Sequence, residues 1–207
     1  MKGKFITFEG CEGAGKSRQV KMLEQYLIEN KIDYYITREP GGTAISEQIR
    51  KVILDANNSE MTDECEVLLY AASRIQLIKQ ELLPRLEKGQ LVICDRYVDS
   101  SLAYQGFARG LGYDFVAGVN EYALKTLSPD CTIFLNLPPI EAFKRKGGAD
   151  KGDRLEQSGL AFHEKVYGGY LELAKIHADR FCVIDPRGER EETHAKIVQA
   201  LKNKGIL

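Results

Sequence analysis

The sequence has no excess of charge of either sign. Its 207 residues contain 29 lysines and arginines against 30 aspartates and glutamates, and the formal net charge at pH 7 is −1. A large nucleic-acid interface normally requires a basic excess, so we expect no nucleic acid among the partners. The hydrophobic share of 43% and the charged share of 29% are typical of a globular chain. The length favours a single domain over residues 1–207.

Long hydrophobic runs are also absent from the sequence. No run approaches the roughly 18 residues from which a membrane-spanning helix is recognised. The apolar segment near the N-terminus is too short for a secretory signal peptide. We therefore expect a chain that does not enter a membrane and that works in the cytoplasm.

The five cysteines and three histidines form no recognisable motif. The cysteines are odd in number, no two are close in sequence, and three lie in apolar, strand-like runs. This pattern favours reduced thiols in the core over a disulfide framework or a zinc site. The histidines form no H-E-x-x-H or C-x-x-C set, so we assign them no metal. These residues are Cys11, Cys65, Cys94, Cys131, Cys182, His163, His177 and His194.

The clearest feature that is present is a phosphate-binding loop. Residues 10–17 have the complete G-x-x-x-x-G-K-[ST] pattern, between an apolar strand at 4–9 and a helix that begins near Lys16. Glycines let the backbone wrap a phosphate at the positive end of the helix dipole. We expect Lys16 to extend from an exposed position to the terminal phosphates of a nucleoside triphosphate, and the Ser17 hydroxyl to bind Mg²⁺. The expected nucleotide-binding residues are Gly10, Cys11, Glu12, Gly13, Ala14, Gly15, Lys16 and Ser17.

Strand-like and helix-like segments alternate along the rest of the chain. Repeated βα units predict an α/β fold, with a parallel sheet of five strands, helices on both faces and ligands at the carboxyl ends of the strands. The charged, glycine-rich stretch 144–153 interrupts this rhythm and is typical of a mobile lid, which we place at about 144–156. The expected strands cover 4–9, 34–37, 91–94, 131–136 and 181–184, and the later helices cover 43–56, 62–87, 113–127, 140–146, 160–177 and 191–202.

Acidic and basic residues follow two of these strands. Arg38 and Glu39 come after the second strand, and Asp95 and Arg96 come after the third. A carboxylate beside Ser17 suits Mg²⁺, and guanidinium groups suit a second phosphate because they bind it bidentately. For either pair alone, a surface ion pair or a helix cap remains an alternative.

Two helices present side chains that suit a nucleobase. Tyr70 and Arg74 are four residues apart, and Ser101, Tyr104 and Gln105 have the spacing i, i+3 and i+4, so each group shares a helix face. An aromatic plane, a cation and hydroxyl or amide groups provide stacking and edge hydrogen bonds. For any one residue, a half-buried tyrosine or an arginine lying along the surface is an equally good interpretation.

Six segments together form a pattern that covers nearly the whole chain. They are Gly-x-Glu-Gly-x-Gly-Lys-Ser at 10–17, Arg-Glu-Pro-Gly-Gly-Thr at 38–43, Leu-Tyr-Ala-Ala-Ser-Arg at 69–74, Asp-Arg-Tyr at 95–97, Ser-Ser-x-Ala-Tyr-Gln at 100–105 and Asp-Arg-Leu-Glu at 153–156. This set resembles the thymidylate kinase family. The resemblance implies the P-loop nucleoside monophosphate kinase fold, a homodimer, and transfer of the γ-phosphoryl group of ATP to dTMP.

The resemblance also implies roles on the acceptor side. Arg38 and Arg96 would lie around dTMP, with Arg96 nearest its phosphate and acting in catalysis, and Glu39 would belong to the same binding set. Glu12 would face the 3′-hydroxyl of the sugar. Tyr104 would lie against the 2′ carbon and exclude a ribose hydroxyl.

For the base, the resemblance implies contacts from the two helices named above. Tyr70 would stack on thymine, and Arg74 would donate a hydrogen bond to its O4 atom. Ser101 and Gln105 would complete the edge of the base.

On the donor side, the resemblance implies that Arg145 lies on adenine, beside the loop that contains Arg187. Some family members carry an arginine at the position of Gly13, and its absence here implies that a catalytic cation comes from the lid. We expect Arg154 to be that cation, because it belongs to the Asp-Arg-Leu-Glu segment, with Lys151 as the second candidate.

Two other functions stay open at this point. A deoxynucleoside kinase of related fold would phosphorylate a sugar hydroxyl and would need a carboxylate as the base. A P-loop switch or partner-binding ATPase would hydrolyse ATP without any acceptor. The response to a nucleoside and to nucleoside monophosphates distinguishes these functions from the expected one.

Overall fold

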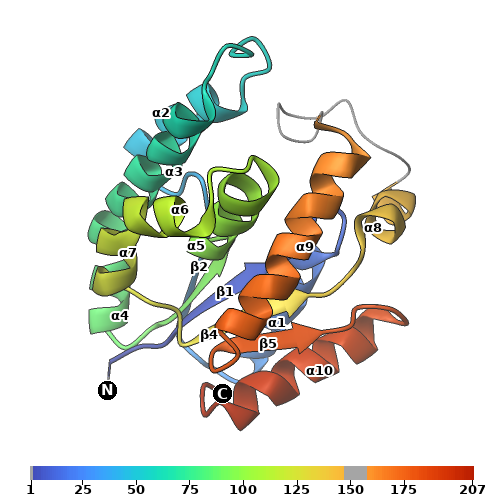
Figure 1. The fold of residues 1–207 in the computed structure, drawn as a ribbon. Helices are drawn as coiled ribbons and strands as arrows, with labels where there is room; N and C mark the ends of the chain where they lie inside the picture. Colours follow the sequence, from blue (N-terminus) through green and yellow to red (C-terminus); the bar gives the residue numbers. More distant parts are fainter. Residues whose placement is uncertain (1, 147–157) are drawn as a thin grey trace.

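The computed structural model describes residues 2–146 and 158–207. Its centre is an all-parallel sheet of five strands in the order β2-β3-β1-β4-β5 (Figure 1), which confirms the expected sheet. Because β1 lies in the middle, the loop that follows it opens at the centre of the carboxyl edge. The strands are β1 Phe5–Glu9, β2 Tyr34–Arg38, β3 Leu91–Asp95, β4 Cys131–Leu135 and β5 Phe181–Ile184.

Helices cover both faces of the sheet, as expected. On one face, α1 and α10 pack against each other and against Ile6 and Phe8 of β1. On the other face, a larger group that includes α3, η2 and α9 packs on Phe5. Neighbouring residues of β1 thus face opposite layers, as the pleat of a strand requires. The helices are α1 Lys16–Glu29, α2 Ala44–Leu54, α3 Asp63–Leu77, α4 Leu83–Glu87, α5 Val98–Ser101, α6 Tyr113–Val119, α7 Glu121–Thr126, α8 Pro139–Lys146, α9 Leu160–Ile176 and α10 Arg190–Asn203, with the π-helices η1 Ile78–Leu82 and η2 Leu102–Ala108.

Two expected long helices are not continuous α-helices. The segment expected at 62–87 consists of α3, the π-helix η1 and α4, and Pro84 lies in the first turn of α4. Because proline has no N–H to donate, the regular hydrogen-bond ladder cannot continue through this point. The segment expected at 113–127 is divided into α6 and α7 at Asn120, whose side chain donates to the Val116 carbonyl at 2.9 Å and caps α6.

The cysteines differ in burial, which corrects the expectation that all are core thiols. All five are free, but Cys65 is exposed on α3, on the helix face that also carries the exposed Leu68 and Ala72. Cys182 of β5 is half-buried, and its sulfur lies 3.3 Å from that of Cys131 on the neighbouring strand β4. The two thiols are therefore close in space although they are far apart in sequence.

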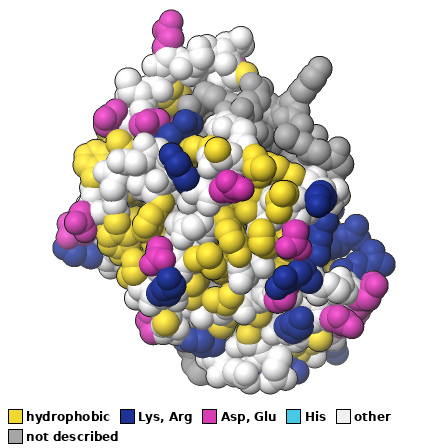
Figure 2. Space-filling model, turned by 45° about the vertical axis from the view of Figure 1, so that its right-hand side comes forward, with side chains coloured by type: hydrophobic (Ala, Val, Ile, Leu, Met, Phe, Trp, Pro, Cys, Tyr) yellow, Lys and Arg dark blue, Asp and Glu magenta, His cyan; other side chains and the backbone are white. Residues whose placement is uncertain are grey.

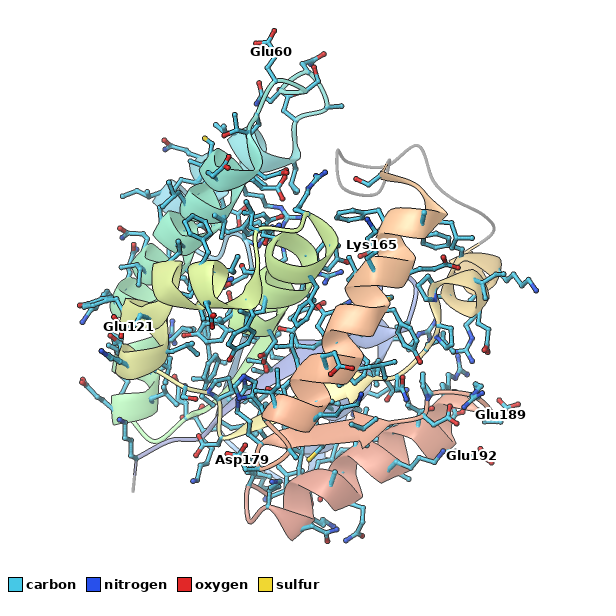
Figure 3. All side chains as sticks on the ribbon, in the orientation of Figure 1. Glu60, Glu121, Lys165, Asp179, Glu189 and Glu192 are labelled. Carbon is cyan, nitrogen blue, oxygen red and sulfur yellow. The ribbon has the colours of Figure 1, made fainter. Side chains whose placement is uncertain are left out.

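Two of the connections between secondary-structure elements carry exposed acidic side chains. In Figure 3, Glu60 lies at the tip of the loop that joins α2 to α3, and Asp179 lies in the turn between α9 and β5. Every helix in residues 2–146 and 158–207 is too short or too polar to cross a membrane.

Candidate active site

The phosphate-binding loop connects β1 to α1 through three glycines with positive φ. The φ angles are 138° at Gly10, 79° at Gly13 and 101° at Gly15, a region that favours glycine. A Cβ atom would lie 2.8 Å from the Leu135 carbonyl oxygen at Gly10, and 2.6 Å from the Ala142 carbonyl oxygen at Gly13. The loop therefore needs glycine both for its conformation and for its close approach to β4 and α8.

Lys16 is the first residue of α1 and is not exposed, which corrects the sequence-based expectation. Only 6% of its surface is accessible, and its Nζ donates to the carbonyl oxygens of Gly10 at 3.0 Å and Cys11 at 3.2 Å. Burial, and secondarily the Arg96 guanidinium, lower the pKa of Lys16. The ammonium group is thus held over the loop, at the positive end of the α1 dipole.

Ser17 and Asp95 form a pair of oxygen ligands beside the loop. The Ser17 hydroxyl donates to Asp95 Oδ2 at 3.4 Å, and Asp95 Oδ1 is buried without a hydrogen-bond partner among the described residues. A buried carboxylate oxygen without a donor is costly unless a cation or another partner compensates for it. A hydroxyl and a carboxylate suit Mg²⁺, which takes few protein oxygens and keeps several waters.

A cavity extends from the loop to the helices on one side of the sheet. The residues that line it come from the loop, the ends of β2 and β3, α3 and the α5–η2 segment, so the fold brings the expected acceptor-side residues together. The acceptor-side residues are Glu12, Arg38, Glu39, Tyr70, Arg74, Arg96, Ser101, Tyr104 and Gln105, and Lys16, Ser17 and Asp95, expected at the donor phosphates and Mg²⁺, line the same cavity.

Arg96 is the most extensively held cation in this cavity. Its backbone has a φ of 74°, unusual for a residue with a side chain. Its Nη2 donates to Glu12 Oε2 at 2.8 Å and to the Tyr104 hydroxyl at 3.3 Å, and its Nη1 donates to Ser100 Oγ at 3.2 Å. The guanidinium is therefore fixed in direction as well as in position.

Glu9 lies beneath Arg96 and was not identified from the sequence. It is fully buried and accepts hydrogen bonds from the Tyr97 backbone N–H at 2.8 Å, from Ser100 Oγ at 2.6 Å and from the Tyr170 hydroxyl at 2.8 Å. Burial, with the nearby carboxylate of Asp99, raises the pKa of Glu9 to about 7. The sequence does contain one sign of this role, since Glu9 is an acidic residue in a strand that is otherwise mostly apolar.

Arg38 and Glu39 are neighbours in the sequence, but they form ion pairs with other residues. The Arg38 guanidinium forms a two-point ion pair with Glu47, at 2.8 and 3.2 Å, and this contact lowers the pKa of Glu47 to about 2. The Glu39 carboxylate instead accepts a hydrogen bond from Arg74 Nε at 2.7 Å, in a buried ion pair. Arg38 thus forms a surface ion pair and also lines the cavity.

Arg74 crosses the cavity wall between three elements. It is 1% exposed, and besides Glu39 it donates to Asn120 Oδ1 and, at 3.2 Å, to the Ser101 hydroxyl. Its guanidinium is thereby oriented by Glu39 at the end of β2, by Asn120 at the break between α6 and α7, and by Ser101 of α5. No pattern in the sequence marks Asn120 as a partner of Arg74.

Further cavity residues were also missed from the sequence. Arg50 of α2 donates to the Pro40 carbonyl at 2.8 Å, and His163 of α9 lies on the far wall. Both belong to amphipathic helices in which one polar residue among many carries no distinguishing pattern. The additional lining residues are Pro40, Arg50, Leu54, Tyr97, Ser100 and His163.

Of the described residues expected around adenine, the structure places only Arg145 beside the phosphate-binding loop. Arg145 lines a second, more open hollow together with the loop, and its Nη1 donates to the Pro186 carbonyl at 3.1 Å. Arg187 is paired with Asp185 at 2.7 Å and lines neither this hollow nor the cavity. Lys151 and Arg154 lie outside the described residues.

The near-zero net charge is unevenly distributed over the surface. In Figure 2, Lys and Arg side chains gather at one edge of the face, with several Asp and Glu side chains among them, beside a central area of hydrophobic side chains.

Comparisons with known proteins agree with the six-segment pattern. A family model described as thymidylate kinase matches residues 8–197. The chain is 48% identical over 202 residues to a thymidylate kinase of Caldanaerobacter subterraneus subsp. tengcongensis, covering 98% of this chain and 96% of that protein. It is also 44% identical to a thymidylate kinase of Finegoldia magna, covering 98% of this chain and 100% of that protein.

Replacing Lys16 with alanine should lower the rate of phosphoryl transfer from ATP by at least about 100- to 1,000-fold, the usual effect of removing a group that stabilises transition-state charge. Steady-state kinetics measures the loss. Because Lys16 is buried, circular dichroism should accompany the assay to show that the variant is folded. The exposed Lys21 of α1 provides a matched control, and Lys21→Ala should retain the wild-type rate. A folded Lys16→Ala variant with the wild-type rate would contradict the role of the loop.

Proposed function

The chain belongs to the thymidylate kinase family, and we propose that it transfers the terminal phosphoryl group of ATP to dTMP and so forms dTDP. One observation supports this most directly: the hollow at the phosphate loop and the arginine-lined cavity share Glu12, Lys16 and Ser17. Two anionic nucleotides bound in these two places would meet at Lys16. Direct transfer between them requires this geometry.

The chemistry of a phosphate acceptor agrees with the side chains in the cavity. The phosphate of a nucleoside monophosphate is mostly dianionic at neutral pH, since its second pKa is about 6. No base has to remove a proton from it, in contrast to a sugar hydroxyl. The enzyme must instead hold two anions close together and compensate their charge, a task that suits Lys16, Arg96 and Arg38.

On the donor side, the loop N–H groups and Lys16 would bind the β- and γ-phosphates. Ser17 and Asp95 would hold Mg²⁺, which compensates phosphate charge when it is bound. Arg145 would stack on adenine, with Arg187 nearby. Lys151 and Arg154 remain the proposed sources of a further cation, in the part of the chain outside the described residues.

On the acceptor side, Arg96 and Arg38 would bind the phosphate of dTMP, and Glu39 would orient Arg74. The Arg96–Glu12 ion pair at 2.8 Å supports adjacent roles on phosphate and sugar, with Glu12 toward the 3′-hydroxyl. Tyr104, whose hydroxyl accepts from Arg96, would lie against the 2′ carbon.

The base would lie between α3 and η2. Tyr70 would stack on thymine, Arg74 would donate to O4, and Ser101 and Gln105 would contact the remaining edge. Their common position on the cavity wall supports this assignment.

We also propose a homodimer that works in the cytoplasm. Leu68 on α3 is 56% exposed, and Ile45 and Val52 on the neighbouring helix α2 are about half exposed. Phe115 of α6 is also exposed. These side chains, next to helices that form the cavity wall, are suited to a twofold contact that removes apolar surface from water. Free cysteines agree with a reducing compartment.

A coupled assay with ATP and a set of acceptors tests the activity. dTMP should be the best acceptor and should exceed dUMP by roughly 10- to 200-fold in kcat/KM, the usual value of one buried methyl group. Thymidine should not be phosphorylated. Phosphorylation of thymidine in place of dTMP would indicate a deoxynucleoside kinase, and ATP hydrolysis that no acceptor changes would indicate an ATPase.

Replacing Tyr104 with alanine should relax the choice between deoxyribose and ribose. The wild type should use the ribonucleotide analogue of dTMP poorly, because the ring crowds the 2′ position. The deoxy-to-ribo ratio of kcat/KM should fall in Tyr104→Ala. Tyr104→Phe keeps the ring and serves as the control, so its ratio should stay close to that of the wild type. An unchanged ratio in Tyr104→Ala would show that another residue excludes the hydroxyl.

The dimer is tested by the mass of the particle in solution. Light scattering at micromolar concentration should give twice the mass of the chain, and Leu68→Lys should shift the particle toward the monomer because it buries a charge in the contact. Val183→Lys on the edge strand β5, which is exposed far from α3, should leave the dimer intact. A monomeric wild type would refute the proposal.

A further inference from the structure

The side-chain amide of Gln105, which lines the cavity, is hydrogen-bonded to a buried carboxylate outside the cavity lining. Its amide nitrogen donates to Glu66 Oε1 at 2.7 Å, and both residues are at most 1% exposed. Gln105 lies on η2 and lines the cavity, whereas Glu66 lies on α3 and does not. Because Glu66, Tyr70 and Arg74 are spaced four apart on α3, they share the helix face that is turned toward the cavity.

The contact determines which end of the Gln105 amide faces which way. A glutamine amide has a donor end and an acceptor end and can present either one. A carboxylate only accepts, so the NH₂ group has to turn toward Glu66. Among the described residues, none donates a hydrogen bond to Gln105 Oε1. The carbonyl oxygen is thus the end left to meet a ligand.

A second contact holds the other oxygen of Glu66. Its Oε2 accepts from Arg109 Nη2 at 3.3 Å, and Arg109 also forms an ion pair with Asp63 at 3.3 Å. A fully buried carboxylate costs stability unless it is paired. Arg109, which does not line the cavity, thus pairs with one oxygen of Glu66, while the other oxygen accepts the hydrogen bond from Gln105.

We infer that Glu66 is a specificity-determining residue, which acts by orienting Gln105 so that the cavity accepts an imide base and rejects cytosine. This inference rests on the proposed function. Thymine carries an N3–H donor, which pairs with a carbonyl oxygen. Cytosine has an unprotonated N3, which meets the same oxygen as a second acceptor. An unpaired buried polar group of this kind lowers affinity strongly.

The test is Glu66→Gln, assayed with dTMP and dCMP as separate acceptors. The new side-chain amide can donate to Gln105 Oε1, so Gln105 can turn over and present its NH₂ group to the base. The dTMP-to-dCMP ratio of kcat/KM should fall at least about 10-fold, the lower value for one misplaced hydrogen bond in a buried site. KM for ATP should not change, because Glu66 is remote from the phosphate loop.

Two controls separate orientation from a merely structural contact. Asp63→Asn removes the other acid on Arg109 without touching Gln105, and it should keep the wild-type ratio. In a Gln105→Met background, Glu66→Gln should have no further effect on the ratio, since it acts through Gln105. Equal losses with dTMP and dCMP, or an effect that persists in the Gln105→Met background, would overturn the inference.

A swapped pair provides the rescue. Glu66→Gln with Gln105→Glu again has one amide and one carboxylate at the contact, with only an acceptor toward the cavity, so selectivity should return to within about 3-fold of the wild type. This pair also carries the test if Glu66→Gln alone does not fold, and a ratio that stays low would count against the inference. If the wild type itself does not phosphorylate dTMP, the proposed function fails. If it does and Glu66→Gln keeps the ratio, only the present inference fails.

Discussion

The phosphate loop fits between β1 and α1 because its backbone passes closer to two neighbouring carbonyl oxygens than any side chain would allow. A Cβ atom at Gly10 or Gly13 would lie within 2.8 Å of the oxygens of Leu135 and Ala142. This approach places the N-terminus of α1 at the carboxyl edge of the sheet, beside its central strand. Lys16 can then fold over the loop, and the ends of β2 and β3 can face it. The rest of the site is arranged around this contact.

Buried carboxyl groups around the cavity are hydrogen-bonded to elements that are far apart from them in sequence. Glu9 holds Ser100 and Tyr170 beneath Arg96, and Glu39 holds Arg74. Burying such groups costs free energy, and paired burial is at best a weak source of stability. At a site that must bind anionic ligands, this cost is offset by preorganisation. Hydrogen-bond donors that are already fixed in direction do not have to reorganise when charge develops on the ligands.

The sheet was predictable because its signals are local. Apolar runs bounded by turns predicted all five strands to within about one residue at each end, and their alternation with helices predicted a parallel sheet. The interior of the helices was less predictable. The π-helix η1 precedes Pro84, and η2 packs on α9, so their geometry depends on a missing donor and on a distant partner. Helical periodicity alone contains neither cause.

The sequence by itself determined the phosphate loop, the parallel sheet around it and the set of residues at the strand ends, since each depends on residue type and on spacing over a few positions. Only the tertiary structure decided the partners. Arg38 pairs with Glu47 and Glu39 with Arg74, and neither pairs with its neighbour in the chain. Side chains of adjacent strand residues point to opposite sides, so ion pairs form with whatever the packing of α2 and α3 brings within reach. The same packing places a buried carboxylate of α3 behind the amide of η2, which a linear pattern cannot specify.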